Sequence, residues 1–173
     1  MRRIITGHNE NRKSIILIEG PPARSLGEEA GGLHEIWNTD GSGFDTTSQD
    51  DRADIDVRLS PSKGGTKVRY FQINPIPEGV SQELIEASTA EAFEKMGATH
   101  HRVDTSRNAA MHETDTIDYI ILLKGDVTLI LDEEEIQVKP HDVVVQRGTN
   151  HAWVNNGTEP ALLIAVLIDS SLV

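Results

Sequence analysis

The segment that decides the fold is MHETDTIDYIILLKG, residues 111–125. It reads as a β-strand that ends in a turn at Gly125. Successive side chains of a strand point to opposite faces, so one face is expected to carry His112, Thr114, Thr116 and Asp118. The segment therefore predicts one wall of a pocket, lined by polar side chains.

A second segment, HDVVVQRGTNHAWVN, covers residues 141–155. It is expected to turn at Gly148 and to present His151 directly after that turn. His112 and His151 thus stand in two separate strand-turn-strand segments. We interpret the two segments as the halves of one small-molecule site.

The two segments resemble the two sequence motifs of the cupin superfamily, H-x-H-x(3 or 4)-E-x6-G and G-x5-P-x-G-x2-H-x3-N. In the first motif, His112 stands at the first histidine, Thr114 at the second, Asp118 at the glutamate and Gly125 at the glycine. The resemblance covers roughly residues 98–169.

The second motif matches at Gly148, His151 and Asn155, whereas Gln146 replaces its proline and its leading glycine is shifted or lost. The resemblance implies an all-β, RmlC-like cupin barrel or jelly roll in one structural domain. In this reading, residues 1–75 form a strand-rich extension that packs on the barrel. Residues 76–173 form the cupin core, with a helix at 81–97 and the motifs at 112–125 and 141–155.

The resemblance also implies a site. The corresponding cupin positions bind a divalent metal, so His112, Asp118 and His151 are the expected ligands for Zn, Fe, Mn or Ni. The same three residues are the expected catalytic groups, and Thr114, Thr116 and Arg147 are expected to contact substrate. Thr114 is a poorer ligand than histidine, which leaves open a metal-free pocket that works by hydrogen bonding or acid–base catalysis.

Other side chains have simpler interpretations. His100 and His101 are adjacent and predict a solvated pair after the helix, although either could restore a lost ligand. Tyr119 and Trp153 are both expected on the face opposite the proposed ligands.

Turn residues divide the chain into short strands, which is typical of an antiparallel barrel or sandwich. The helix at 81–97 is predicted by a cap at Ser81 and a stop at Gly97, either on the outside of the barrel or over one mouth. In the second half of the chain, strands are predicted at about 116–124, 126–132, 135–138, 142–146, 151–155 and 161–168. In the first half, strands are predicted at 14–19, 33–37, 56–59 and 66–74.

Composition and charge disfavour several classes of function. The formal net charge of −12 over 173 residues disfavours binding to nucleic acid or to an anionic membrane. Without cysteine, neither a disulfide nor a thiolate metal site can form. The glycines show no nucleotide-binding spacing, and no stretch approaches the roughly 20 apolar residues of a membrane span. A cytoplasmic protein without a nucleotide cofactor is expected.

The incomplete histidine set favours a non-redox lyase, decarboxylase, dehydratase or isomerase that acts on a carbonyl or hydroxy compound. A non-haem metal dioxygenase and a non-catalytic small-ligand binding protein remain alternatives. The edges of the strand-rich first half predict a homodimer.

Overall fold

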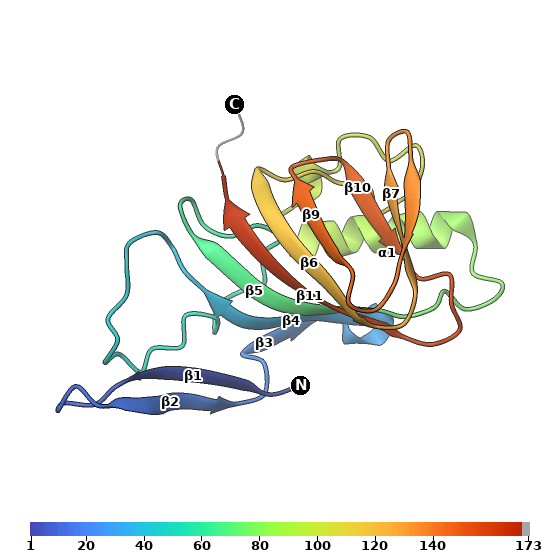
Figure 1. Ribbon diagram of the computed structural model, residues 1–173. Helices are drawn as coiled ribbons and strands as arrows, with labels where there is room; N and C mark the ends of the chain where they lie inside the picture. The colour runs from blue at the N-terminus through green and yellow to red at the C-terminus, as the bar shows by residue number, and fades with distance from the viewer. Residues whose placement is uncertain (171–173) are drawn as a thin grey trace.

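The computed structural model describes residues 1–170, which fold into two facing β-sheets, a separate hairpin and one α-helix (Figure 1). The strands and helix are β1 (Arg3–His8), β2 (Ser14–Gly20), β3 (Arg24–Leu26), β4 (Gly31–Asn38), β5 (Thr66–Ile73), α1 (Gln82–Lys95), β6 (Thr116–Lys124), β7 (Val127–Leu131), β8 (Glu135–Val138), β9 (Val143–Arg147), β10 (His151–Val154) and β11 (Ala161–Asp169). Two short 3₁₀ turns lie at Glu28–Ala30 and Thr99–His101.

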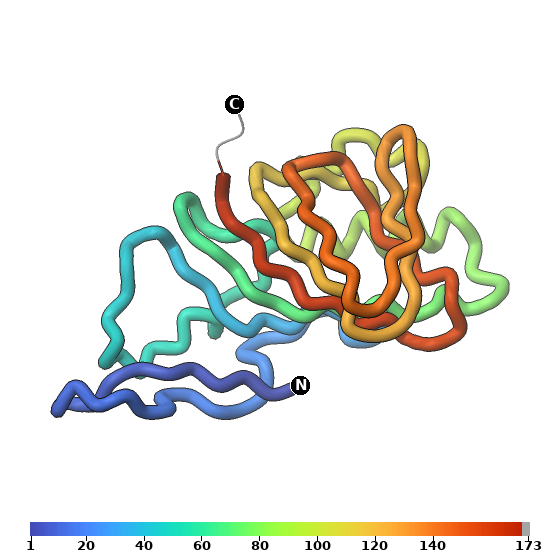
Figure 2. Tube along the Cα trace, viewed as in Figure 1, coloured from blue at the N-terminus to red at the C-terminus, as the bar shows by residue number. Residues whose placement is uncertain are grey.

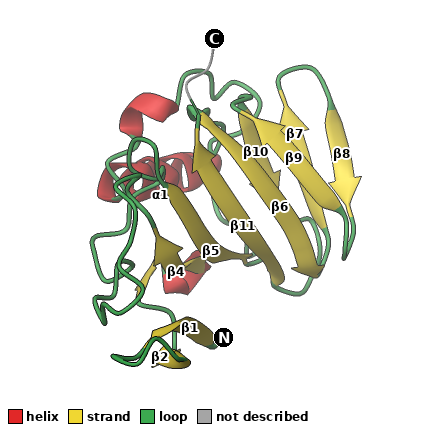
Figure 3. Cartoon of the chain, turned by 60° about the vertical axis from the view of Figure 1, so that its left-hand side comes forward, coloured by secondary structure: helices red, strands yellow, loops and turns green. Residues whose placement is uncertain are grey.

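The larger sheet has the strand order β3-β4-β5-β11-β6-β9, and the smaller sheet has the order β10-β7-β8 (Figure 3). Strand β11 is apolar on both faces, which suits its place inside the larger sheet. Its inward side chains, Ala161, Leu163, Ala165 and Leu167, are buried and belong to the main hydrophobic core between the sheets. The expected all-β architecture with one helix is confirmed.

Cross-strand register fixes which residues share the inner face of the larger sheet. Ala165 of β11 lies opposite Arg69 of β5 on one side and opposite Ile120 of β6 on the other. In the next inward row, Leu167 pairs with Asp118. Because side chains alternate along each strand, these residues all face the smaller sheet.

Helix α1 begins after Ser81, whose side chain accepts a hydrogen bond from the backbone N–H of Leu84. It ends before Gly97, whose φ of 65° is easily adopted without a Cβ. Phe93 and Met96 turn inward and form a second buried cluster with Leu59 and Ala98. Phe93 also reaches the cavity between the sheets, so the helix covers one mouth of the barrel.

The β1–β2 hairpin stands off from the two facing sheets (Figures 1 and 2). Arg3 ties it to the body of the protein through an ion pair with Asp51 and a 2.8 Å hydrogen bond to the carbonyl of Pro21. No helix among residues 1–170 is both long and apolar enough to span a bilayer.

All six strands predicted in the second half begin and end within one residue of the observed bounds. The strand predicted at 56–59 is wrong. Val57 and Leu59 are buried there, but the carbonyl of Arg58 accepts a hydrogen bond from the side chain of Lys67 instead of joining a ladder. Strands β1 and β3 were not predicted, and the proposed division at residue 75 stays a prediction.

Candidate active site

The site is built around a contact between the two sequence motifs. The backbone N–H of His112 donates to the carbonyl of His151 at 2.9 Å, and the N–H of His151 donates to the carbonyl of His112 at 3.0 Å. This isolated bridge places the two imidazole rings with their centroids 4.2 Å apart. The expected meeting of the two histidines is therefore present in the fold.

Backbone carbonyls orient both rings. Nδ1 of His112 lies 2.8 Å from the carbonyl of Ala110, and Nδ1 of His151 lies 2.8 Å from the carbonyl of Thr149. A carbonyl only accepts, so each Nδ1 carries the proton and each Nε2 carries a lone pair. The side-chain amide nitrogen of Gln146 lies 2.8 Å from both ring nitrogens of His151, and it donates to Nε2 because Nδ1 carries a proton. The lone pair of His112 has no such protein donor in the hydrogen bonds of residues 1–170.

Burial keeps both histidines neutral. Desolvation lowers the pKa of His112 to about 4 and that of His151 to about 3. The neighbouring His112 ring adds to the effect on His151, because two imidazolium charges at this separation would repel. Both rings therefore act as hydrogen-bond acceptors or bases at neutral pH.

The two histidines open into a cavity of about 170 Å³ between the sheets. An apolar cavity of about 150 Å³ suffices to bind benzene, so this space suits a small ring or short chain. Phe71 and Trp153 form an edge-to-face pair in its wall, with centroids 6.2 Å apart. Its lining comprises Leu33, Arg69, Phe71, Ile73, Phe93, Ala110, His112, Asp118, Ile120, His151, Trp153, Ala165 and Leu167.

Asp118 supplies the carboxylate of the cavity from strand β6. It is 5% exposed, and its Oδ1 atom has no hydrogen-bond partner among residues 1–170. Desolvation raises the pKa of Asp118 to about 6, although Thr116 and Arg69 favour the charged form. A carboxyl group with this pKa exchanges protons readily near neutral pH.

Arg69 is a cavity residue that the sequence analysis did not single out. It is 3% exposed, and its Nη2 atom lies 2.6 Å from Oε1 of Glu35, which is buried on the adjacent strand β4. Lys67 also faces Glu35, with 3.4 Å between Nζ and Oε2. Arg69 could have been found from the sequence, because Lys67 and Arg69 stand at alternate positions of a predicted strand and therefore share one face.

The two threonines of the first motif lie elsewhere. The chain bends at Asp115 and strand β6 starts at Thr116, which shares the inner face of Asp118 but lies nearer the start of the strand. Thr114 and Thr116 are both buried, and their hydroxyl groups bond to each other at 2.6 Å. Neither lines this cavity, and their contact with substrate stays a prediction.

Two further expectations need correction. Arg147 is exposed because it follows Gln146 on β9 and points to the other face of the sheet, so it does not line the cavity. Trp153 lies two residues after His151 on β10 and therefore shares its face and lines the cavity. Tyr119, by contrast, is 42% exposed on the outer face of β6, as expected from its position beside Asp118.

The donor set does not fit the metal centre implied by the resemblance. Thr114 is turned away, and the lone pair of His151 already accepts a hydrogen bond from Gln146. Among residues 1–170, no group of three or more His, Asp or Glu side chains is arranged to hold a metal ion. His112, Asp118 and His151 share a cavity, but we assign no chemical step to a metal there.

His100 and His101 lie on the outside of this cavity. Their rings are 4.1 Å apart, and they line a separate hollow with Glu113, Thr114 and Asp115. Burial and the neighbouring His100 lower the pKa of His101. Neither ring completes the set of ligands around His112 and His151.

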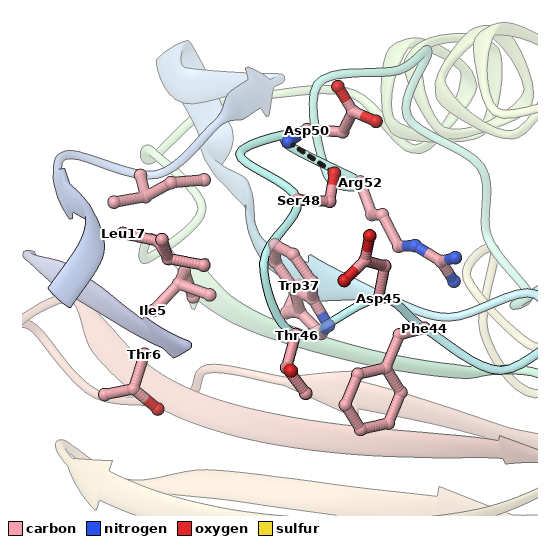
Figure 4. Close-up of a pocket in the computed structure, with 11 residues that line it drawn as sticks. Ile5, Thr6, Leu17, Trp37, Phe44, Asp45, Thr46, Ser48, Asp50 and Arg52 are labelled. Carbon is pink, nitrogen blue, oxygen red and sulfur yellow. Dashed lines mark hydrogen bonds between the residues drawn. The ribbon is translucent and has the colours of Figure 1, made fainter. Parts of the chain in front are cut away.

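A larger hollow of about 250 Å³ lies between the β1–β2 hairpin and the segment 44–52 (Figure 4). Ile5, Leu17 and Trp37 form one part of its wall, and Phe44 and Arg52 form another. No residue of the two sequence motifs lines it. The cavity at His112 and His151 is therefore the better candidate for the active site.

Part of the chain is similar in sequence to known proteins. Residues 100–167 match the family model described as Cupin domain. The chain is 29% identical over 162 residues to phomopsin biosynthesis cluster protein C' of Diaporthe leptostromiformis, covering 88% of this chain and 69% of that protein. It is 27% identical over 176 residues to the cupin-domain-containing oxidoreductase fogC of Aspergillus ruber, covering 96% and 71%.

Among solved structures, TT1209 of Thermus thermophilus aligns with a TM-score of 0.40 and 16% identity, over 66% of this chain and 81% of that one. The family match spans His112, Asp118 and His151, the residues that the fold brings to one cavity. Residues 100–167 of the chain are thus similar to the cupin domain family.

Proposed function

We propose that this cupin enzyme moves a proton on a small carbonyl or hydroxy compound, as a non-redox lyase, decarboxylase, dehydratase or isomerase. The observation that carries the proposal is that, among residues 1–170, neither Oδ1 of buried Asp118 nor Nε2 of His112 has a hydrogen-bond partner, and both residues line one apolar cavity. Two proton acceptors of different basicity that face one cavity are suited to acid–base chemistry.

In the proposed reaction, the Asp118 carboxylate removes a proton from the carbon next to the substrate carbonyl. The electron pair of the broken C–H bond forms a C=C bond, and the carbonyl π pair moves onto oxygen to give an enolate. Asp118 then returns the proton to another carbon, or to a leaving hydroxyl group. His112 accepts a hydrogen bond from a substrate hydroxyl at Nε2, which orients the substrate.

The apolar wall has a role in this scheme. Phe71, Phe93 and Trp153 exclude water from the reacting atoms, which strengthens electrostatic interactions with the developing charge. The cavity volume of about 170 Å³ limits the substrate to a compact molecule. These features favour a substrate with an apolar ring or chain next to its carbonyl.

Acetophenone is a suitable probe, because its methyl protons lie next to a carbonyl and its ring matches the cavity. The protein in D₂O, under strict anaerobiosis, should incorporate deuterium into the methyl group faster than buffer, as followed by proton NMR. Asp118→Asn should lower the enzymatic rate by about 100-fold or more, the usual size of a general-base contribution.

Tyr119→Phe is the matched control, because Tyr119 is adjacent in sequence but lies on the outer face of the same strand. It should exchange acetophenone at the wild-type rate. Exchange by the wild-type protein at the buffer rate, or equal rates for wild type and Asp118→Asn, would refute proton transfer by Asp118.

A second candidate is an oxidoreductase. It is favoured by the names of three relatives, which are called cupin-domain-containing oxidoreductases, among them virC of Hypocrea virens, at 27% identity over 96% of this chain. A dioxygenase of this kind would consume dioxygen in proportion to product. A non-catalytic binding protein would instead retain acetophenone without exchanging its protons.

Three expectations from the sequence complete the proposal. A divalent metal at His112, Asp118 and His151 stays a prediction, as do the homodimer and the cytoplasmic location. The homodimer is supported by the outer face of the larger sheet, where Tyr119, Val143 and Val145 are exposed. Trp37, Val68, Val166, Tyr119 and Val145 form one continuous row across that face.

A further inference from the structure

Arg69 projects from the centre of the larger sheet into the cavity and retains an unused hydrogen-bond donor. Its Nη2 atom contacts Glu35 and donates to the carbonyl of Arg58. Its Nε atom is buried and has no hydrogen-bond partner among residues 1–170. An unpaired guanidinium N–H costs free energy in a buried site, so a partner in the cavity would relieve that cost.

The charges around Arg69 favour an oxygen that carries negative charge. Glu35 is shared between Arg69 and Lys67, so two cations face one carboxylate. Burial lowers the pKa of Lys67 to about 8, which leaves it mostly protonated at neutral pH. Asp118 also acts on Arg69 through its charge, so only one carboxylate faces the two cations once Asp118 has taken the substrate proton.

The strand register leaves room for a ligand beside Arg69. Ala165 lies directly opposite it on β11, and its short side chain leaves the space above the sheet open. Asp118 lies on β6, on the other side of β11, where it pairs with Leu167 one inward row from Ala165, and its charge acts on Arg69. A small molecule above Ala165 can therefore meet Arg69 at one end and Asp118 at the other.

The histidines do not supply an equivalent donor. Nδ1 of His112 and Nδ1 of His151 each donate to a backbone carbonyl. Their Nε2 atoms carry lone pairs and repel an oxyanion. The proposed reaction nevertheless builds negative charge on the substrate oxygen, and that charge needs a donor.

We propose that Arg69 is a catalytic residue whose Nε–H binds the substrate carbonyl oxygen and stabilises the enolate that forms on it. This inference rests on the proposed function. It supplies the hydrogen-bond donor to the carbonyl oxygen that the proposed reaction needs. It also narrows the substrate to a compact apolar molecule with a carbonyl at one end and an acidic C–H within reach of Asp118. No covalent bond to the protein forms, and the proton passes only between substrate and Asp118.

The test uses 4-nitrophenol, whose phenolate oxygen resembles an enolate oxygen and whose ionised form absorbs visible light. The protein carries Asp118→Asn, which mimics the carboxyl group after it has taken the proton. Bound 4-nitrophenol should ionise at a pH about one unit or more below that of free 4-nitrophenol, a tenfold change in proton affinity. Arg69→Lys in the same background keeps a charge facing Glu35 but removes Nε–H, and should abolish most of this shift.

Removal of Arg69 alone would leave Glu35 short of a partner, so a second variant combines Arg69→Met with Glu35→Met. Replacement of a whole buried ion pair by apolar side chains is commonly tolerated. This variant should also lose the shift, and circular dichroism checks its fold. Tyr119→Phe in the Asp118→Asn background is the matched control, because Tyr119 lies on the outer face of β6. It should bind 4-nitrophenol and lower its ionisation pH as the Asp118→Asn protein does.

An ionisation shift that survives Arg69→Lys and the double replacement would overturn the role of Arg69. Failure of 4-nitrophenol to bind the Asp118→Asn protein would overturn it as well. Neither result decides the proposed function, because deuterium exchange into acetophenone tests proton transfer by Asp118 separately.

Discussion

His112 and His151 pair through two backbone hydrogen bonds and hold neutral imidazole rings 4.2 Å apart at the mouth of an apolar cavity. Protonation of either ring would place a charge in a desolvated position beside the other ring. Protonation of either ring is therefore unfavourable in the folded protein, so acid should lower its stability.

The free energy of unfolding should fall as the pH is lowered from 6.5 towards 4. The pKa of His151 is about 3 in the folded protein and near 6.5 when unfolded, so the unfolded chain binds more protons in this interval. His151 alone should cost about 3 kcal/mol by pH 4. Urea unfolding at several pH values measures the slope, which His151→Gln should reduce. Equal slopes for the two proteins would contradict the prediction.

Asp118→Asn should stabilise the protein at pH 7 and have little effect on its stability at pH 3. The folded-state pKa of Asp118 is about 6, above its ordinary value of 3.8, so ionisation is less favourable in the folded protein. This penalty is absent below pH 3.8, grows between pH 4 and 6, and is complete above 6. Thermal unfolding of both proteins at the two pH values provides the comparison. A variant less stable than wild type at pH 7 would show that the carboxylate is well solvated or paired.

The metal prediction is checked by elemental analysis of freshly purified protein. If a divalent metal is bound through the histidines, His112→Ala and His151→Ala should each remove it, because neutral imidazole is a strong ligand for such metals. Thr114→Ala should change metal content little, because its hydroxyl bonds to Thr116. Greater metal loss from Thr114→Ala than from either histidine variant would show that the family motif was transferred wrongly.

The wild-type protein should have the mass of a dimer at micromolar concentration. Val143 and Val145 are 60% and 52% exposed on an apolar sheet face, and such faces are commonly covered by a partner. Val145→Lys would place a charge in that interface and should shift the protein towards monomer. Light scattering after gel filtration measures both masses, with Lys139→Glu, on an exposed turn, as the charge-changing control. A monomeric mass for the wild-type protein would contradict the predicted homodimer.

The motif residues could be predicted from the sequence because their signal is local. His112, Asp118 and His151 lie at family spacings within two short segments, and the strands around them alternate apolar and polar residues. Helix α1 was also predictable, because Ser81 and Gly97 supply its cap and its stop within one segment.

Some errors arose where a local rule was extended too far. Alternation predicts which face a side chain takes but not how far the cavity extends along the strand: Thr116 shares the face of Asp118, yet its hydroxyl bonds to Thr114 and it does not line the cavity. Val57 and Leu59 have strand-like alternation without forming a strand, and Leu59 is buried against Phe93 and Met96, which lie in and directly after a distant helix.

By itself, the sequence determined the family resemblance, the all-β class and the residues that meet between the two motifs, because spacing and alternation are properties of adjacent positions. The tertiary structure decided what surrounds them. Arg69 becomes a cavity residue only because β11 pairs with both β5 and β6, which brings it to the sheet face that carries Asp118. Such pairing between strands far apart in the chain leaves no local pattern, and the low pKa values of His112 and His151 depend on the same burial.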